Sequence, residues 1–292
     1  MKDFIPRTAA IHDITGFGRC SLSVIIPVLS SMGVQVCPMP TAILSSHPAG
    51  FKNYFFHDLT NKLEDYMDSW KNEDIHFDCI YSGFLGSAKQ IDLAKKFIEE
   101  FKKDDAQLVV IDPVMADHGK LYGIFDGEII NKMRSFIKEA NVITPNFTEA
   151  CFLLDEDYSE EPVDTHKMKH FLKKLSNMGP ENVIVTSVKI VDGGQANIGY
   201  SKRHDLYWKT AYEFVPAHYP GTGDIFASAL TGYLLGGCDL PQAMDKATRF
   251  VSSAVHKTYK ARTPVREGVL LESMLSKLNE ENNLDRSEII NE

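Results

Sequence analysis

The sequence predicts a three-layer α/β/α fold, in which helices cover both faces of a mostly parallel central sheet. Strand-like segments alternate with helical segments along most of the chain, as in parallel sheets whose strands are joined by helices. The segment 107–112 is apolar almost throughout, as a parallel strand buried on both faces should be. The chain of 292 residues is long enough for one large α/β domain. We expect that domain over residues 1–279, followed by a polar, frayed tail over 280–292.

Short runs rich in β-branched and apolar residues are expected to form the strands. The parallel ones span 8–12, 34–42, 77–81, 107–112, 141–145 and 182–187. Two further strands of alternating character, at 195–201 and 205–215, are predicted to form a hairpin.

Helices are expected between and after these strands. The first spans 21–32 and ends at Gly33, a residue type that often stops helices. Ser87 is the predicted N-cap of a helix over 88–102, and Asn146 with Glu149 three residues later matches a capping box. The remaining helices are expected at 59–70, 127–140, 165–178, 222–236, 240–260 and 267–279. The long loop 114–123 contains two glycines and is predicted to be a mobile flap.

Gly221, Thr222, Gly223 and Asp224 open one of these helices. Two glycines allow successive backbone N–H groups to converge, and the helix start adds unpaired N–H groups and a positive dipole end. The stretch therefore predicts an anion-binding cradle. Asp224 beside it has two interpretations, a helix cap or a general base that accepts a proton from an attacking hydroxyl in phosphoryl transfer.

Composition and charge argue against several classes of protein. The net charge of −9 is unsuited to a nucleic-acid partner, and no apolar run approaches the roughly 18 residues of a membrane span. The first residues are not followed by the apolar stretch of a secretory signal. Five scattered cysteines without a C-x-x-C pair indicate reduced thiols. We expect a cytoplasmic protein.

Polar residues follow the carboxyl end of every predicted parallel strand, where open α/β sheets bind ligands. They are Asp13, Ser45, Ser46, His47, Ser82, Asp112, Thr144, Asn146, Thr186 and Ser187, and Gly83 and the aromatic Phe84 follow Ser82. Each alone is typical of a turn or cap, but together with Gly221–Asp224 they outline a site.

These residues divide into two chemical groups. Oxygen ligands of the kind that Mg²⁺ prefers, held partly through water, come from Asp112, Asp117, Asn146 and Glu149. Hydroxyl and N–H groups for phosphates come from Thr186, Ser187 and the glycine cradle.

Other nucleotide-binding patterns are incomplete or absent. Gly16-x-Gly18 follows a strand, but Ser21 stands in place of the third glycine of a dinucleotide fingerprint. The Walker A motif and the protein-kinase motifs are missing. What remains is a small-molecule kinase that uses a metal, a glycine cradle and one carboxylate base.

Four stretches are similar to known motifs. Residues 220–228 (PGTGDIFAS) resemble the second signature of the ribokinase-like superfamily. Residues 82–87 (SGFLGS), 111–117 (IDPVMAD) and 143–149 (ITPNFTE) resemble its vitamin B6 branch, the pyridoxal/pyridoxamine kinases. The match runs from about residue 8 to 275 in the family's order. It implies a ribokinase-like fold and ATP-dependent phosphorylation of the 5′-hydroxymethyl group of pyridoxal, pyridoxamine or pyridoxine, in the salvage of pyridoxal phosphate.

The resemblance also implies roles for residues that handle the transferred phosphate. Asp224 would be the base that deprotonates the hydroxymethyl group, and Gly221, Thr222 and Gly223 would form the anion hole for the γ-phosphate. Asn146 and Ser187 would contact the phosphates.

Cations and assembly follow from the same resemblance. Asp117 and Glu149 would hold Mg²⁺–ATP, largely through water. A monovalent cation, K⁺ or Na⁺, would lie among Asp112, Thr144 and Thr186. The loop after Val114 would cover the nucleotide, and the protein would be a homodimer.

The substrate residues implied by the family are Asp13, Ser45, His47 and Phe84. Many pyridoxal kinases carry serine at the position of Asp13, which meets the pyridine ring, and the aspartate could pair with a protonated ring nitrogen or with the amine of pyridoxamine. Pro48 stands where threonine is common. Phe84 replaces a frequent tyrosine and keeps its stacking surface.

Two alternatives remain. Hydroxymethylpyrimidine kinases of thiamin synthesis share the fold and the base. A catalytically silent ligand-binding protein could also use this fold, although the intact Gly-Thr-Gly-Asp stretch argues against it.

Overall fold

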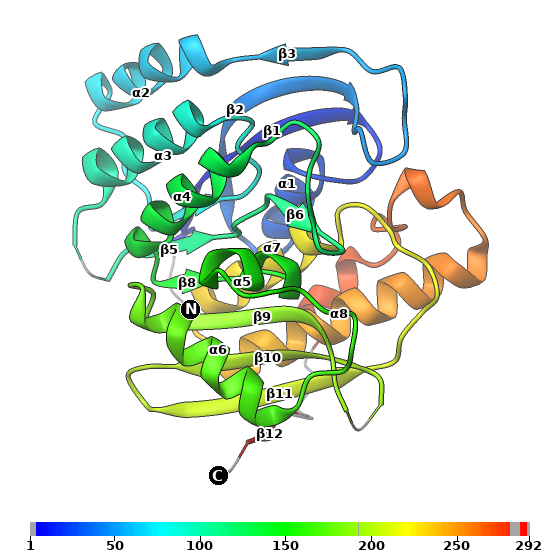
Figure 1. Ribbon diagram of the computed structural model, residues 1–292. Coiled ribbons are helices and arrows are strands. Elements are labelled where there is room, and N and C mark those ends of the chain that lie inside the picture. The colour runs from blue at the N-terminus through cyan, green and yellow to red at the C-terminus, as the bar shows by residue number, and fades with distance from the viewer. Residues whose placement is uncertain (1–3, 105, 192, 281–286, 291–292) are drawn as a thin grey trace.

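A large, mostly parallel sheet forms the centre of the computed structural model, which describes residues 4–104, 106–191, 193–280 and 287–290 (Figure 1). Its strand order is β12-β11-β10-β9-β8-β5-β4-β1-β2-β3. The strands are β1 (Arg7–Phe17), β2 (Gln35–Ser46), β3 (Phe56–Asp58), β4 (Cys79–Ser82), β5 (Leu108–Ile111), β8 (Val142–Ile143), β9 (Asn182–Lys189), β10 (Gln195–Ser201), β11 (Leu206–Tyr212) and β12 (Glu288–Ile289). Strands β2, β1, β4, β5, β8 and β9 are parallel, whereas β10–β12 and β3 add antiparallel edges.

Helices cover both faces of this sheet, which confirms the predicted three-layer α/β/α class (Figure 1). They are α1 (Leu22–Ser31), α2 (Leu63–Asn72), α3 (Ala88–Phe101), α4 (Gly127–Phe136), α5 (Phe147–Leu154), α6 (Thr165–Asn177), α7 (Thr222–Leu235) and α8 (Leu240–Ala261). One apolar core lies between the sheet and α2–α6, and another lies between the sheet and α1, α7 and α8.

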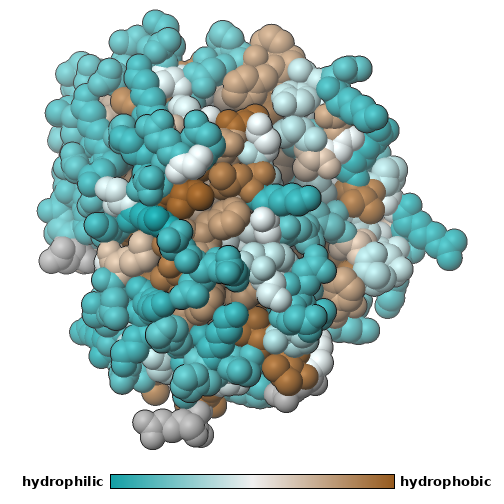
Figure 2. All heavy atoms as spheres, in the orientation of Figure 1, coloured by the Kyte–Doolittle hydropathy of each residue, from teal (hydrophilic) through white to brown (hydrophobic). Residues whose placement is uncertain are grey.

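The alternation of side chains along each strand supplies both cores. In β1, Ala9 and Ile11 belong to the first core and Ala10 to the second, because successive strand residues point to opposite faces. The outer surface seen in Figure 2 is mostly hydrophilic, with smaller hydrophobic areas between. None of the described helices is both long enough and apolar enough to span a membrane.

Most predicted elements are confirmed, but several ends differ. β1 and β2 extend to Phe17 and Ser46, so Asp13 and Ser45 lie within strands and not in the loops after them. β2 is extended because β3, which the sequence did not predict, pairs with it. β8 has only two residues, and Pro145 after it offers no N–H to a neighbouring strand.

Two larger corrections concern the flap and the C-terminal part. The loop 114–123 contains a hairpin of β6 (Ala116–Asp117) and β7 (Lys120–Leu121). The helix predicted at 267–279 is wrong: two 3-10 turns, Val265–Glu267 and Leu275–Asn279, flank an irregular stretch. Gly268 in this stretch has φ of 76° and lies against Arg19, which is incompatible with a continuous helix.

The predicted tail is partly ordered. Within 280–292, β12 pairs with β11, while 281–286 and 291–292 lie outside the described residues, so the frayed tail stays a prediction. The division into a domain over 1–279 and a tail stays a prediction. All five cysteines are described and free, as predicted.

The parallel strands end at one edge of the sheet. The carboxyl ends of β1, β2, β4, β5, β8 and β9, together with the start of α7, therefore bring the polar residues predicted from the sequence to one side of the molecule.

Candidate active site

The glycine cradle at the start of α7 is shaped by a close contact between two loops. Gly221 is the N-cap of α7 with φ of 83°, in the left-handed region. A Cβ atom at Gly221 would lie 2.0 Å from the carbonyl oxygen of Arg19. Only glycine fits there, and its absent side chain allows the loop between β1 and α1 to pack against the cradle.

Asp224 is held by that same loop. Its Oδ2 accepts a hydrogen bond of 2.8 Å from the backbone N–H of Ser21, a residue with φ of 52°. Among the described residues, no side chain caps the start of α7, and Asp224 stands at the third helical position after the N-cap Gly221. The cap interpretation therefore loses its support, and the carboxylate is directed to the loop between β1 and α1.

The environment of Asp224 favours its neutral form. The pKa of Asp224 is raised to about 7, mainly by burial; the hydrogen bond from the Ser21 backbone lowers it in part, and the charge of Asp13 makes a smaller contribution that raises it. A carboxyl group with a pKa near neutrality can exchange a proton with an alcohol more effectively than an ordinary aspartate.

Asp13 lies in β1 close to Asp224 and is buried, with 4% of its surface exposed. Its Oδ2 accepts a hydrogen bond from Thr15 Oγ1 at 3.0 Å. Burial raises the pKa of Asp13, while hydrogen bonds from the side chains of Ser21 and Thr15 lower it. Ser21 thus lies beside two carboxylates: its backbone N–H bonds Asp224, and its side chain lowers the pKa of Asp13.

Asp112 lies beneath the cradle, after β5. A Cβ atom at Gly223 would lie 3.7 Å from its Oδ2, and Thr144 Oγ1 donates to its Oδ1 at 3.1 Å. Burial and then the charge of Asp224 raise the pKa of Asp112 to about 8. Such a group of carboxylates with few opposing charges suits a bound cation, which would favour their ionised forms.

Glu149 and Asn146 form the predicted capping box of α5 and also support the flap. Glu149 Oε1 accepts from the backbone N–H groups of Met115 (3.0 Å) and Ala116 (3.4 Å), and its Oε2 accepts from Asn146 N–H at 2.9 Å. Asn146 Nδ2 donates to the Ala116 carbonyl at 2.8 Å. Burial and the charge of Asp112 raise the pKa of Glu149, against these backbone bonds. Both side chains are therefore engaged in holding the flap.

Asp117 lies at the end of β6. Its Oδ2 lies 3.2 Å from His218 Nε2, just before the cradle, and its Oδ1 accepts from the His118 backbone N–H at 2.8 Å. The flap therefore touches the segment that leads into α7.

Thr186 and Ser187 lie in β9, next to Asn146. Ser187 is exposed, with φ of 58°, and its N–H donates to Asn197 Oδ1 at 3.1 Å. Thr186 is half-buried and forms an isolated bridge with Asn146. Both hydroxyl groups therefore lie at the sheet edge that carries the cradle.

The predicted substrate residues frame the other part of the site. His47 is buried, and its Nε2 lies 2.8 Å from the carbonyl oxygen of Arg266, to which it can donate. A Cβ atom at Gly18 would lie 2.6 Å from the His47 ring, so His47 packs directly on the loop that holds Asp224. Phe84 is half-buried beside Phe125, with ring centroids 5.8 Å apart.

Ser45 is placed differently from its predicted role. It is exposed in β2, its Oγ accepts from the Phe55 N–H at 2.8 Å, and its own N–H donates to the Phe55 carbonyl. Its side chain therefore takes part in the pairing that continues β2.

Sequence reasoning missed Ser21 and Arg266, which contact the site through backbone atoms. Residue type does not indicate such a backbone contact; only the structure shows it, through the positive φ of Ser21.

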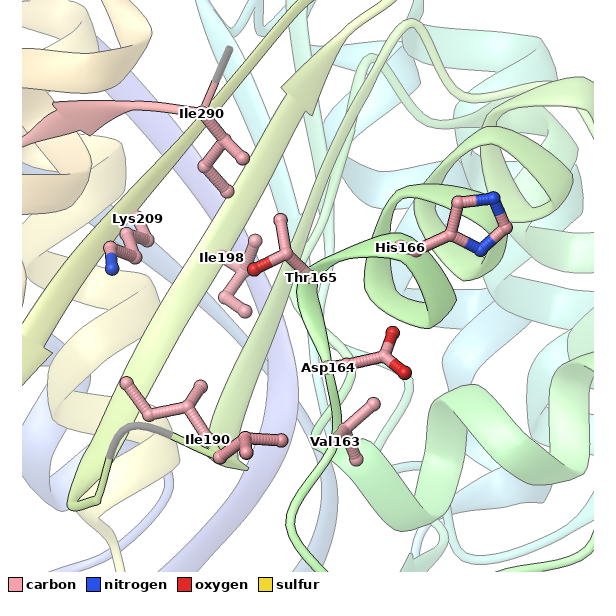
Figure 3. A pocket seen from close by; sticks show the side chains of 9 residues that line it. Val163, Asp164, Thr165, His166, Ile190, Ile198, Lys209 and Ile290 are labelled. Carbon is pink, nitrogen blue, oxygen red and sulfur yellow. The ribbon is translucent and has the colours of Figure 1, made fainter. Parts of the chain in front are cut away.

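A separate pocket of about 360 Å³ lies beside the start of α6 and the β9–β10 turn, with Asp164, His166 and Lys209 among its lining residues (Figure 3). None of the predicted site residues lines it.

Known proteins are similar to this chain. The model of the phosphomethylpyrimidine kinase family matches residues 26–267. The chain belongs to this family.

Solved structures of relatives cover nearly the whole kinase chain. A protein of Bacteroides thetaiotaomicron, provisionally named a phosphomethylpyrimidine kinase and crystallised with pyridoxal, is 42% identical with a TM-score of 0.93 over 98% of this chain and 100% of its own. Pyridoxal kinase from Lactobacillus plantarum is 30% identical with a TM-score of 0.84, over 94% and 97% of the two chains. Pyridoxal kinase of Arabidopsis thaliana is 27% identical over 84% of this chain and 77% of its own. These likenesses confirm the ribokinase-like fold and the predicted resemblance to pyridoxal kinases.

Proposed function

We propose that this kinase transfers the γ-phosphoryl group of ATP to the 5′-hydroxymethyl group of a B6 vitamer: pyridoxal, pyridoxamine or pyridoxine. The observation that carries the proposal is the likeness, over nearly the whole chain, to the Bacteroides structure that contains pyridoxal. The arrangement of Asp224 beside a glycine cradle supports the same chemistry.

In the proposed reaction, Asp224 accepts the proton of the substrate hydroxyl. The hydroxyl oxygen then forms a bond to the γ-phosphorus while the bond between that phosphorus and the bridging oxygen breaks, and ADP leaves with the bonding electrons. Backbone N–H groups of Gly221, Thr222 and Gly223 stabilise the negative charge on the transferred group. The hydrogen bond from the Ser21 backbone N–H holds Oδ2 of Asp224 against the loop between β1 and α1 and so fixes the orientation of the carboxylate.

Cations would complete the phosphate side of the site. Asp117, and Glu149 through water, would hold Mg²⁺, which supplies charge neutralisation of the phosphates when bound. Asp112, Thr144 and Thr186 would hold a monovalent cation, K⁺ or Na⁺. The raised pKa values of Asp112 and Glu149 support this assignment, because both result first from burial and then from the charge of a neighbouring carboxylate, and a bound cation would offset both effects.

The vitamer ring would lie between Asp13, His47 and Phe84. Asp13 offers a carboxylate to a protonated ring nitrogen or to the amine of pyridoxamine, and Phe84 offers an apolar face. Asn146 and Ser187 would contact the ATP phosphates from the other side, and the β6–β7 hairpin would cover the nucleotide.

Hydroxymethylpyrimidine is the second candidate acceptor. The family model that matches this chain is described as that of phosphomethylpyrimidine kinase, which favours this alternative specifically. Both acceptors present a hydroxymethyl group on a nitrogen heterocycle, so the base and the cradle do not distinguish them.

The deciding experiment measures ATP consumption by the purified protein with each B6 vitamer and with hydroxymethylpyrimidine. We expect turnover with at least one vitamer that exceeds turnover with the pyrimidine. Phosphorylation of the pyrimidine alone would overturn the B6 assignment. If none of the acceptors raises ATP consumption above background, a silent binding protein would be favoured.

We further propose a cytoplasmic homodimer. Light scattering coupled to size exclusion tests the assembly, since a monomeric mass at working concentrations contradicts it.

A further inference from the structure

Three metal-ligating side chains meet where the β6–β7 hairpin touches the segment before α7. Asp117 Oδ2 lies 3.2 Å from His218 Nε2 and 3.8 Å from His118 Nε2. The two histidine rings have centroids 5.2 Å apart, and one ligand atom from each of the three residues lies within 4.8 Å of the others.

One of these separations equals the edge of a tetrahedral metal site, and the others are close to it. With metal–ligand bonds of about 2.0–2.1 Å at tetrahedral angles, neighbouring ligand atoms stand about 3.3 Å apart. The Asp117–His218 distance already has this value, and the Asp117–His118 distance exceeds it by about half an ångström. Small rotations of two exposed imidazole rings would complete the triangle.

The carboxylate is oriented for such a role. Asp117 Oδ1 is engaged by the His118 backbone N–H at 2.8 Å, which leaves Oδ2 facing both histidine rings. A hydrogen bond of this kind to a ligating group fixes its orientation and supports metal binding. Asp117 is half-buried, whereas both histidines are exposed, so an ion can enter from solvent.

We propose that Asp117, His118 and His218 form a binding site for one Zn²⁺ ion or a similar divalent transition metal. Two imidazole nitrogens and one carboxylate oxygen suit zinc, whereas Mg²⁺ prefers oxygen ligands throughout. Three protein ligands leave a fourth position for water or for a phosphate oxygen. The ion ties the tip of the hairpin to the segment that leads into Gly221.

The first test measures Zn²⁺ binding by calorimetry to protein without a histidine tag, nucleotide or Mg²⁺, because Asp117 is also the proposed Mg²⁺ ligand and the two ions would compete for it. We expect one Zn²⁺ per chain. His118→Ala and His218→Ala should each weaken binding by at least about tenfold, because the loss of an outer-shell partner alone commonly costs that much. His170→Ala, which removes an exposed histidine on α6, is the matched control and should bind as the wild type does.

The second test asks whether the ion joins the two segments. Zn²⁺ should slow amide hydrogen exchange across 117–121 in the wild type and leave it unchanged in His218→Ala, since the variant keeps the hairpin but lacks the ligand across the gap. Unchanged circular dichroism verifies that each variant is folded.

The proposal is wrong if either histidine variant binds Zn²⁺ within about twofold of the wild type, if His170→Ala loses as much affinity, or if exchange across the hairpin does not respond. None of these readouts needs an acceptor or turnover, so they stand apart from the proposed kinase activity.

Discussion

Replacing Asp224 by asparagine should lower activity and raise stability at the same time. Asparagine keeps an oxygen that can accept from Ser21 N–H, but it cannot take a proton from the substrate. Loss of a positioned general base costs on the order of 10²–10⁴ in turnover, while ATP should still bind.

The stability change follows from the raised pKa. The shift from 3.8 to about 7 is about 3 pKa units, or about 4 kcal/mol at 1.36 kcal/mol per unit. Because part of the side chain remains exposed, we expect about half of this, about 2 kcal/mol. The folded wild type binds the proton more tightly than the unfolded chain, so its stability falls as pH rises from about 4 through about 7. Asparagine does not ionise, so the gain in stability of Asp224→Asn over the wild type is small near pH 4 and largest above pH 7.

Urea unfolding at several pH values, in EDTA and without nucleotide, measures this advantage, and steady-state ATP consumption measures turnover. Asp239→Asn is the control, because Asp239 is the exposed N-cap of α8 and asparagine caps equally well. It should stay within about 0.5 kcal/mol at every pH. Turnover of Asp224→Asn within a few-fold of wild type, or a loss of stability above pH 7, would refute the reasoning.

Three other predictions concern the surroundings of the base. Gly221→Ala should destabilise the protein by about 1–3 kcal/mol and nearly abolish turnover, because a methyl group would collide with the Arg19 carbonyl. Gly223→Ala should fold with a smaller loss of stability. Equal unfolding midpoints of the two variants in thermal scans would contradict this prediction. Glu149→Ala should cost about 2 kcal/mol in urea unfolding, since three backbone N–H groups lose their acceptor, and a change below about 0.5 kcal/mol would argue against that bracing role. Asp13→Ser should alter the order of preference among B6 vitamers in kcat/KM, and an unchanged order would remove Asp13 from ring binding.

The sequence predicted the fold largely because its parallel strands are continuous apolar runs with clear helix caps between them. Ser87 and the Asn146–Glu149 box were found from residue type and spacing alone. The ends of β1 and β2 were not, because pairing with distant chain segments extends them. The helix expected at 267–279 failed because Gly268 packs against Arg19, a contact between residues far apart in sequence.

The candidate site was predictable in membership and less so in geometry. Strand-end position was enough to bring Asp112 and Thr144 together at one edge. It could not reveal that Asp224 is bonded by a backbone N–H of Ser21, or that both oxygens of Glu149 are occupied by backbone donors. Such contacts depend on main-chain placement, which side-chain identity does not encode.

Ser21 has a consequence for how the acceptor range of this enzyme can change during evolution. Its main chain bonds Asp224 and its side chain lowers the pKa of Asp13, so a substitution that re-fits position 13 to a new ring also changes the surroundings of the base. Mutations at Asp13 and Ser21 should therefore be epistatic, with combined effects on turnover that depart from the product of the single effects. Lineages that change acceptor would be expected to alter this loop as a unit and not one position at a time.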